Sequence, residues 1–286
     1  MKKILLTLLP SIIISANAAT DTNSSIAVNS TDNTTAVTTT NSLADNMIIN
    51  SSTILNNDIL DKTWKIRDNS KIQTQLIKYL LTNPKYDRSN YETCWKVSRL
   101  VSYLGNFGYG YTYFTKDTSN GIIFFEYGYK AGLAGIKLKP TGTDANYWYA
   151  VNLGSYGLLK GIISSASNAS SGMDALKIVK SSAQDSYDNY GAYRILGRYY
   201  QELPGMFGGS DSKAEMLLKE AVAKSNGFIN NDIFLGNFYL HDKQYQNALT
   251  QCNNALTTKN IAVTKSEQAR YTKEANECVT KATANI

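Results

Sequence analysis

The chain has 286 residues, a formal net charge of +6, three cysteines and one histidine. Its Lys and Arg residues are scattered among Asp and Glu and form no basic stripe, so we expect no nucleic-acid partner. With a single histidine and no Cys-x-x-Cys pair, a zinc site of the usual ligand spacing is excluded, and we expect neither a metal nor a cofactor.

Residues 1–18 have the features of a secretory signal peptide. Lys2-Lys3 precedes a mostly apolar run over residues 4–14, and Ala16-Asn17-Ala18 forms a cleavage site of small residues. The apolar run is too short for an anchored membrane span, and no later stretch is apolar enough to cross a membrane. We therefore expect cleavage after Ala18 and a periplasmic or secreted protein.

Residues 19–61 are dominated by Ser, Thr and Asn, with little apolar content. Such a composition cannot bury enough apolar surface to offset the conformational entropy of the chain. We expect a flexible leader here, in which short apolar segments such as residues 47–49 touch the domain. The folded, helical domain is expected over residues 62–286, with order beginning near Trp64.

The rest of the chain has the apolar spacing of helices. A stripe beginning at Ile72 stops at Asn83-Pro84, and residues 105–113 are expected as a Gly/aromatic loop between helices. We expect about ten helices in antiparallel pairs. The helices whose ranges the pattern defines cover residues 91–105, 120–138, 170–179, 188–202 and 264–284, and one more begins at residue 143 and extends toward residue 163.

Two consecutive stretches near the C-terminus repeat one pattern of large and small residues. In the first, Leu196-Gly197-x-x-Tyr200 is followed, after a glycine-rich loop, by small residues at helical spacing; Leu235-Gly236-x-x-Tyr239 opens the second. This pattern is typical of the tetratricopeptide repeat (TPR). The residues at this spacing in the following helices, most of them small, are Ala214, Leu218 and Ala221 in the first stretch and Ala248, Cys252 and Ala255 in the second.

The pattern predicts an all-α fold in which antiparallel helix pairs stack as a TPR-like solenoid or bundle. The last helix, over residues 264–284, is polar on one face and would cap the stack, because an end repeat has only one neighbour.

Residues 145–154 and 192–210 resemble the periplasmic T component of tripartite TRAP-type transporters. The stretch beginning at Trp148 is also similar to the TPR domain of the regulator of microtubule dynamics family. The resemblance covers residues 65–260 and implies an all-helical, TPR-like bundle with a central tunnel or groove. It further implies a role in assisting a periplasmic substrate-binding protein by passing it a hydrophobic ligand. Members of that family are often lipoproteins, whereas this chain has no cysteine at its cleavage site.

Aromatic residues supply the candidate binding surface. Tyr147-Trp148-Tyr149 and Tyr199-Tyr200 are too consecutive to share one helix face, so some of these rings must point toward a concave surface or groove. Tyr and Trp combine a wide apolar surface with one hydrogen-bonding tip, which suits a peptide or an amphipathic ligand. Tyr193 and Tyr200 also fit the packing positions of a repeat core.

Polar residues near these aromatics add hydrogen-bond donors. Asn152 lies close by in the sequence, and Arg194 and Arg198 are four residues apart on one helix face, where they could grip a carboxylate. Arg198 could equally pair with Glu202, four residues further on. In the loop over residues 203–210, Met206 and Phe207 could serve as a lid or as a packing plug.

Cys252 and Cys278 lie on successive expected helices and could form a disulfide; a buried free thiol at Cys252 is the alternative. Cys94 is expected in the core. The only histidine, His241, falls in an expected turn, and no Gly-x-Ser-x-Gly motif occurs. We therefore expect no enzyme.

The favoured interpretation is an exported TPR-like binding or scaffold protein that engages a partner protein or peptide in its concave aromatic face. The alternative is a protein similar to the T component that binds a small hydrophobic or carboxylate ligand in a central tunnel.

Overall fold

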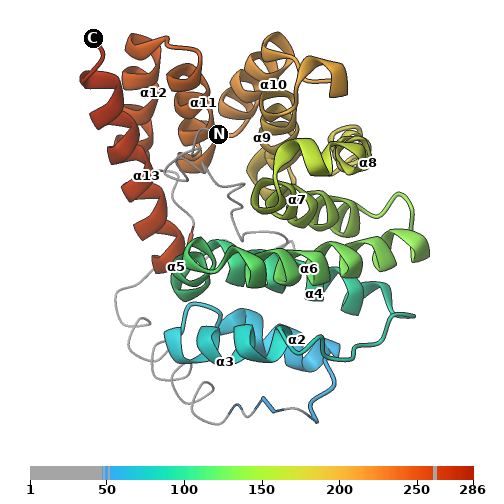
Figure 1. The fold of residues 1–286 in the computed structure, drawn as a ribbon. Coiled ribbons are helices and arrows are strands. Elements are labelled where there is room, and N and C mark those ends of the chain that lie inside the picture. The colour runs from blue at the N-terminus through green and yellow to red at the C-terminus, as the bar shows by residue number, and fades with distance from the viewer. Residues whose placement is uncertain (1–46, 48, 51, 260–262) are drawn as a thin grey trace.

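The computed structural model describes residues 47, 49–50, 52–259 and 263–286, and over these residues the protein is all-α, as predicted (Figure 1). The expected signal peptide and leader residues 19–46 lie outside the described residues. The helices are α2 (Asn57–Lys65), α3 (Ser70–Leu80), α4 (Tyr91–Asn106), α5 (Gly108–Lys116), α6 (Thr118–Leu138), α7 (Thr143–Lys160), α8 (Ile162–Lys180), α9 (Tyr187–Glu202), the short 3-10 helix η1 (Gly205–Phe207), α10 (Asp211–Lys224), α11 (Ile229–His241), α12 (Tyr245–Thr257) and α13 (Lys265–Thr283).

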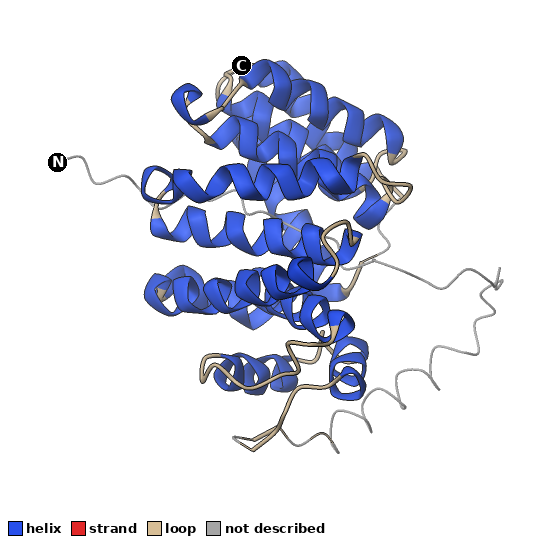
Figure 2. Cartoon of the chain, turned by 90° about the vertical axis from the view of Figure 1, so that its right-hand side faces the viewer, coloured by secondary structure: helices blue, strands red, loops and turns tan. Residues whose placement is uncertain are grey.

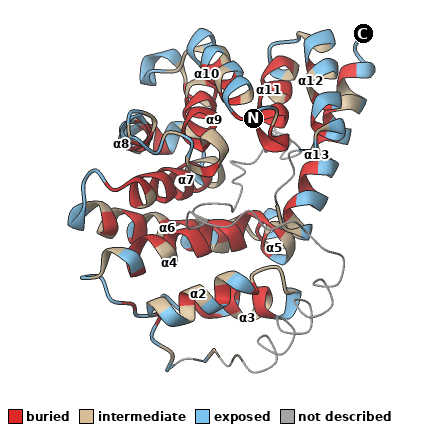
Figure 3. Cartoon of the chain, turned by 180° about the vertical axis from the view of Figure 1, so that it is seen from behind, coloured by how far each residue is buried: buried red, intermediate tan, exposed pale blue. Residues whose placement is uncertain are grey.

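Helices that follow one another in the chain mostly pack against one another. From α6 to α13 each helix contacts the next, and Figure 2 shows the helices lying in successive tiers. Buried residues lie on the sides that face neighbouring helices, and α7 is buried along most of its length (Figure 3). The core is therefore spread along the array and occupies every helix–helix interface.

Small residues bring two of these helix pairs close together. A Cβ atom at Gly197 of α9 would lie 2.9 Å from Leu218 Cγ of α10, and one at Gly236 of α11 would overlap the Cys252 sulfur of α12. Neither glycine could carry a side chain without moving its neighbour. This agrees with the close approach that the repeated spacing predicts.

The last helix is more than a cap on one neighbour. α13 packs against α12 and α11 and also reaches back to α5, as Figure 1 shows. The Thr264 hydroxyl lies 2.9 Å from the Tyr103 hydroxyl of α4, and the backbone N–H of Ser266 donates to Asp68 Oδ1 at 3.1 Å. These contacts connect the C-terminal helix to the N-terminal helices, so the expectation of an end helix with a single neighbour is wrong.

The Gly/aromatic segment over residues 105–113 is helical, and the expected loop is wrong. α4 continues to Asn106, and α5 begins at Gly108 after a break at Phe107. Phe107 is fully buried, with its ring centroid 5.1 Å from that of Tyr103 and 5.8 Å from that of Tyr271. Packing of this ring fixes the break between the two helices, and Gly108, with φ of +55°, supplies the left-handed backbone at which α5 begins.

The serine-rich stretch near residue 170 does not begin a helix. Gly161, with φ of +103°, separates α7 from α8, and α8 runs from Ile162 through this stretch without interruption. Burial of Ala166, Ala169 and Met173 holds the polar sequence in a helix, because tertiary packing outweighs the low helix propensity of serine.

The folded domain also begins earlier than expected. α2 starts at Asn57, and the Asn56 side chain caps it by accepting from the Ile59 backbone N–H at 2.9 Å. Leu55 is fully buried, while Met47 and Ile49 pack against the core as partly buried residues. The expected boundary at residue 62 therefore falls inside a helix.

Cys252 and Cys278 form a disulfide between α12 and α13, with Cα atoms 6.1 Å apart, whereas Cys94 is a buried free cysteine. Of the two alternatives for Cys252, the structure adopts the bonded one. Among the described helices, none combines the length and the apolar character that crossing a membrane requires.

Candidate ligand-binding site

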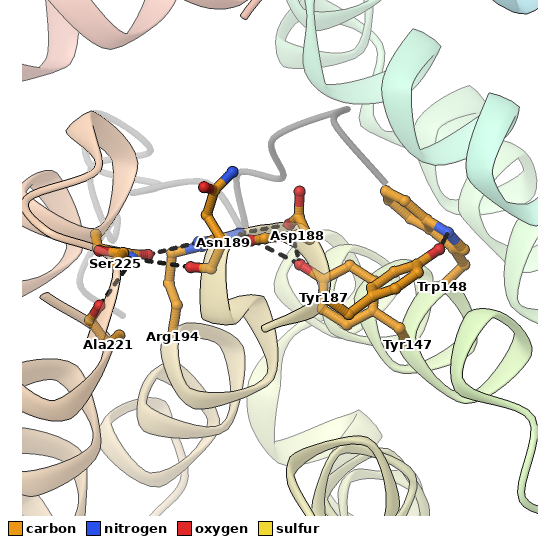
Figure 4. Close-up of polar contacts among 9 residues, drawn as sticks. Tyr147, Trp148, Tyr187, Asp188, Asn189, Arg194, Ala221 and Ser225 are labelled. Carbon is orange, nitrogen blue, oxygen red and sulfur yellow. Dashed lines mark hydrogen bonds and ion pairs between the residues drawn. The ribbon is translucent and has the colours of Figure 1, made fainter. Parts of the chain in front are cut away.

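Four buried polar side chains join α7, α9 and α11 (Figure 4). Arg194 donates to Asp188 Oδ2 at 2.6 Å and to Asn231 Oδ1 at 2.5 Å, and the Tyr147 hydroxyl donates to the same Asp188 oxygen. We call Tyr147, Asp188, Arg194 and Asn231 the polar joint. Asn231 extends it by donating to Ser225 Oγ and to the carbonyl oxygens of Ala221 and Asn189.

A left-handed turn places Asp188 in this joint. Asp188, Asn189 and Tyr190 have φ values of 52°, 52° and 61°, in the region that Asp and Asn tolerate better than a bulky tyrosine. The right-handed helix resumes at Gly191, where a Cβ atom would overlap the Tyr147 hydroxyl. The turn folds the Asp188 carboxylate back onto Arg194, six residues later, which no regular helix could do.

Burial dominates the electrostatics of the joint. Removal from water raises the pKa of Asp188 to about 7, against the opposing influence of Arg194 and of the Tyr147 hydroxyl. Burial likewise raises the pKa of Tyr147 well above its usual value. Arg194 Nη2 and the Tyr147 hydroxyl both donate to Asp188 Oδ2, so the cluster holds three helices together. Asp188 Oδ1 and Arg194 Nε are buried without a hydrogen-bond partner among the described residues.

Aromatic residues continue the cluster toward α4. The Trp148 indole N–H donates to the Tyr187 hydroxyl at 2.9 Å, and Tyr187 donates to Asp144 Oδ1 at 2.8 Å. Asn152, one turn along α7, donates to the Ser98 carbonyl oxygen at 2.9 Å. Each of these donors is therefore engaged inside the fold, whereas Asn152 Oδ1 is buried without a hydrogen-bond partner among the described residues.

The aromatic surface expected from the sequence is not an open face. Tyr147, Trp148 and Asn152 are at most 1% exposed, Tyr149 packs against Gly132 of α6, and Arg194 binds a carboxylate of its own chain. Consecutive aromatics can all be buried here because α7 has neighbours on several sides, namely α4, α6, α8 and α9. The expectation that these rings point to a concave surface is wrong for these residues.

A crevice of about 50 Å³ lies between α7, α8 and α9 and takes in three of the expected site residues, Arg198, Tyr199 and Glu202. This volume corresponds to about three to five water molecules, or to one aliphatic side chain. Most of its wall is apolar or small. The remaining lining residues are Leu153, Gly154, Gly157, Leu158, Ile162, Ser165, Ala166, Ala169 and Leu203.

The charged part of the crevice wall is an ion pair. Arg198 binds Glu202, the i, i+4 partner expected from the sequence, and also donates to Gln201 Oε1 at 2.8 Å. Burial lowers the pKa of Arg198, and Glu202 opposes that shift. The Tyr199 hydroxyl donates to the Ala150 carbonyl oxygen at 2.8 Å, so its ring supplies apolar wall. The crevice is therefore electrically neutral overall.

No family model matches the chain, and no curated protein matches it.

Among the residues that the structure describes, no group of three or more His, Cys, Asp or Glu side chains could hold a metal ion. His241 is the last residue of α11 and is exposed. The chemistry of the crevice is thus that of an apolar contact surface with one neutralised ion pair.

Met206 and Phe207, the two apolar residues of the loop after α9, do not plug the core. They form η1 with Gly205, η1 contacts α8, and the two side chains are 84% and 37% exposed. Ile163, at the start of α8, is 77% exposed. Of the two alternatives, a lid or a packing plug, the plug does not fit, because these side chains remain at the surface beside the elements that form the crevice.

Two residues of the polar joint carried no signal as site residues in the sequence. Asp188 and Asn231 are separated by 43 residues and belong to different helices. The one local signal in the sequence is the pair Asp188-Asn189, because Asp and Asn tolerate a left-handed backbone better than most residues. No spacing rule, however, connects either residue to Arg194.

Proposed function

We propose that the protein is an exported, non-enzymatic binding protein that receives an apolar side chain of a partner polypeptide in the α7–α8–α9 crevice. The observation that carries the proposal is the position of this apolar crevice beside exposed Met206 and Phe207 of η1. An apolar pocket flanked by exposed apolar side chains is typical of a protein–protein contact site. The partner would share the compartment to which the expected signal peptide directs the chain.

The size and charge of the crevice narrow the kind of contact. Its volume suits one aliphatic or methionine side chain better than a bulky ligand. Because Glu202 already neutralises Arg198, the wall does not demand a charged group from the partner. An apolar anchor residue flanked by neutral or mixed-charge contacts fits best.

Site-specific photo-cross-linking in the native host tests the proposal. A photoreactive amino acid at position 206 should capture a polypeptide, whereas the same residue at position 216 should not. Met216 is a matched control because it is also an exposed methionine, 58% exposed, on α10. Ala166→Leu, which extends a side chain into the crevice, should reduce the adduct at 206. Equal adducts at both positions, or no effect of Ala166→Leu, would contradict the proposal.

A second candidate, a small hydrophobic or carboxylate ligand as in the T component resemblance, is favoured by one observation: Arg198 lies on the crevice wall. A carboxylate would have to displace Glu202, whose side chain is 26% exposed and has room to turn outward. Native mass spectrometry of the mature protein from its host separates the candidates. A bound small molecule that is lost in Ala166→Leu supports the second candidate, and an empty protein that co-elutes with a polypeptide supports the first.

A further inference from the structure

Arg99 of α4 is buried between two tryptophans. Its guanidinium carbon lies 3.9 Å from the ring centroid of Trp64, on α2, and 4.7 Å from that of Trp95, one turn earlier on α4. The guanidinium carbon of Arg67 also lies over the Trp64 ring, 4.2 Å from its centroid, so two arginines contact the same indole. The two indoles cover Arg99, which is only 5% exposed.

Arg99 differs from the other buried arginines in having no hydrogen-bond acceptor among the described residues. Its Nε is buried without a partner, as is that of Arg194, but Arg99 takes part in none of the ion pairs formed by the described residues, whereas Arg194 and Arg198 do. A guanidinium carries five N–H donors, and a buried charge without acceptors is costly. Burial lowers the pKa of Arg99 to about 10, which reflects that cost.

The two carboxylates that act electrostatically on Arg99 are bound elsewhere. Asp61 pairs with Lys96 at 2.9 Å, and Asp144 accepts hydrogen bonds from Tyr187 at 2.8 Å and from Tyr91 at 3.5 Å. Both acids contribute to the field at Arg99 without reaching it. With two indoles against it, the guanidinium keeps its N–H edge for an acceptor that the described residues do not supply.

We propose that Arg99, held between Trp64 and Trp95, is a binding site for a ligand that carries a carboxylate next to an apolar or aromatic group. A carboxylate matches the two parallel N–H groups of a guanidinium edge. A monoanion fits better than a phosphate, since Asp61 and Asp144 would repel a second negative charge. The indoles would contact the apolar part of the ligand. This site lies apart from the α7–α8–α9 crevice and does not depend on the proposed function.

Thermal unfolding of the mature chain with sodium benzoate, sodium acetate and sodium phosphate, against sodium chloride at equal ionic strength, tests the site. Benzoate is expected to raise the unfolding temperature by about 2–4 °C, acetate by less and phosphate not at all. Benzoate should also change the tryptophan fluorescence, because two of the three tryptophans flank Arg99.

Three variants decide the outcome. Arg99→Met should lose the benzoate response. Arg99→Lys keeps the positive charge but lacks the pair of parallel N–H donors of a guanidinium, and it should bind benzoate at least about tenfold more weakly. Arg88→Met is the matched control: Arg88 is exposed, lies over the Tyr86 ring at 5.3 Å, and its replacement should leave binding unchanged. If Arg99→Met fails to fold, the affinity of Arg99→Lys decides.

Two results would overturn the site itself: a wild-type protein that responds to none of the three anions, or an Arg99→Lys affinity equal to that of the wild type. A phosphate response larger than the benzoate response would overturn the assignment to a carboxylate.

Discussion

Arg194 and Arg99 are both buried almost completely, yet their surroundings differ. Arg194 is fully buried in the polar joint, where Asp188, Tyr147 and Asn231 meet its donors. Arg99 is 5% exposed and meets the faces of two indoles. The first arginine has its acceptors built into the fold, and the second has none within the part of the chain that the structure describes.

The difference shows that the extent to which a charged side chain is buried says little about whether it stabilises the fold or binds a ligand. A buried arginine with a carboxylate and an amide fixes the helices that carry them, because removing either partner leaves a charge uncompensated. A buried arginine that has only aromatic faces keeps the cost of its unmade hydrogen bonds. The partners of the guanidinium, and not its exposure, separate a structural joint from a candidate site.

The largest expected effect comes from making Arg194 resemble Arg99. Asp188→Ala removes the carboxylate and leaves the guanidinium buried without its counter-charge, which should cost about 3–5 kcal/mol of unfolding free energy at pH 8. Urea unfolding followed by circular dichroism measures the change. Asp188→Asn keeps the shape and one acceptor and should cost less. Equal losses in the two variants would show that the charge is unimportant.

The pH dependence of stability is expected to be the next largest effect. Because the pKa of Asp188 is raised to about 7 in the folded state, the native protein binds more protons than the unfolded chain between about pH 4 and pH 7. This contribution is complete below about pH 4 and is lost as the pH rises through about 7, with an upper limit of about 4 kcal/mol.

The difference between wild type and Asp188→Asn, measured by urea midpoints at each pH, isolates this contribution. The subtraction is needed because burial also raises the pKa of Asp232, to about 6, and that group acts in the same direction. Parallel pH profiles for the two proteins would contradict the assignment to Asp188.

A smaller effect is expected from removing one hydroxyl of the joint. Tyr147→Phe deletes a hydrogen bond to the Asp188 carboxylate and should cost about 1.5–3 kcal/mol, the range for a hydrogen bond to a charged group. Tyr199→Phe is the matched control, because its hydroxyl donates to a neutral carbonyl oxygen and should cost about 0.5–1.5 kcal/mol. If Tyr199→Phe costs as much, the charge of Asp188 does not strengthen the bond.

Arg99→Met is expected to have the smallest effect on stability, below about 1 kcal/mol in either direction. The variant loses two cation–π contacts but also removes a desolvated charge without hydrogen-bond acceptors, and the two effects oppose each other. The same replacement at Arg194 should cost several-fold more in the same urea assay. Similar losses at both positions would remove the distinction between the two arginines.

Part of the candidate site could be read from spacing along the chain. The Arg198–Glu202 pair forms because residues four apart share a helix face, and Trp95 lies beside Arg99 for the same reason. Spacing failed for Tyr147 and Trp148, since consecutive residues imply an exposed face only when a helix has few neighbours. α7 has neighbours on several sides, so both rings are buried.

The sequence by itself determined the all-α fold and the close approach of α9 to α10 and of α11 to α12, because helical period and small residues act within a few turns of chain. Only the tertiary structure decided the rest. Asp188 meets Arg194 through a left-handed turn that buried partners hold in place, Trp64 reaches Arg99 from another helix, and the crevice forms where three helices meet. Each depends on how segments far apart in the chain pack together, and the spacing of residues within one helix carries no information about which distant segments will meet.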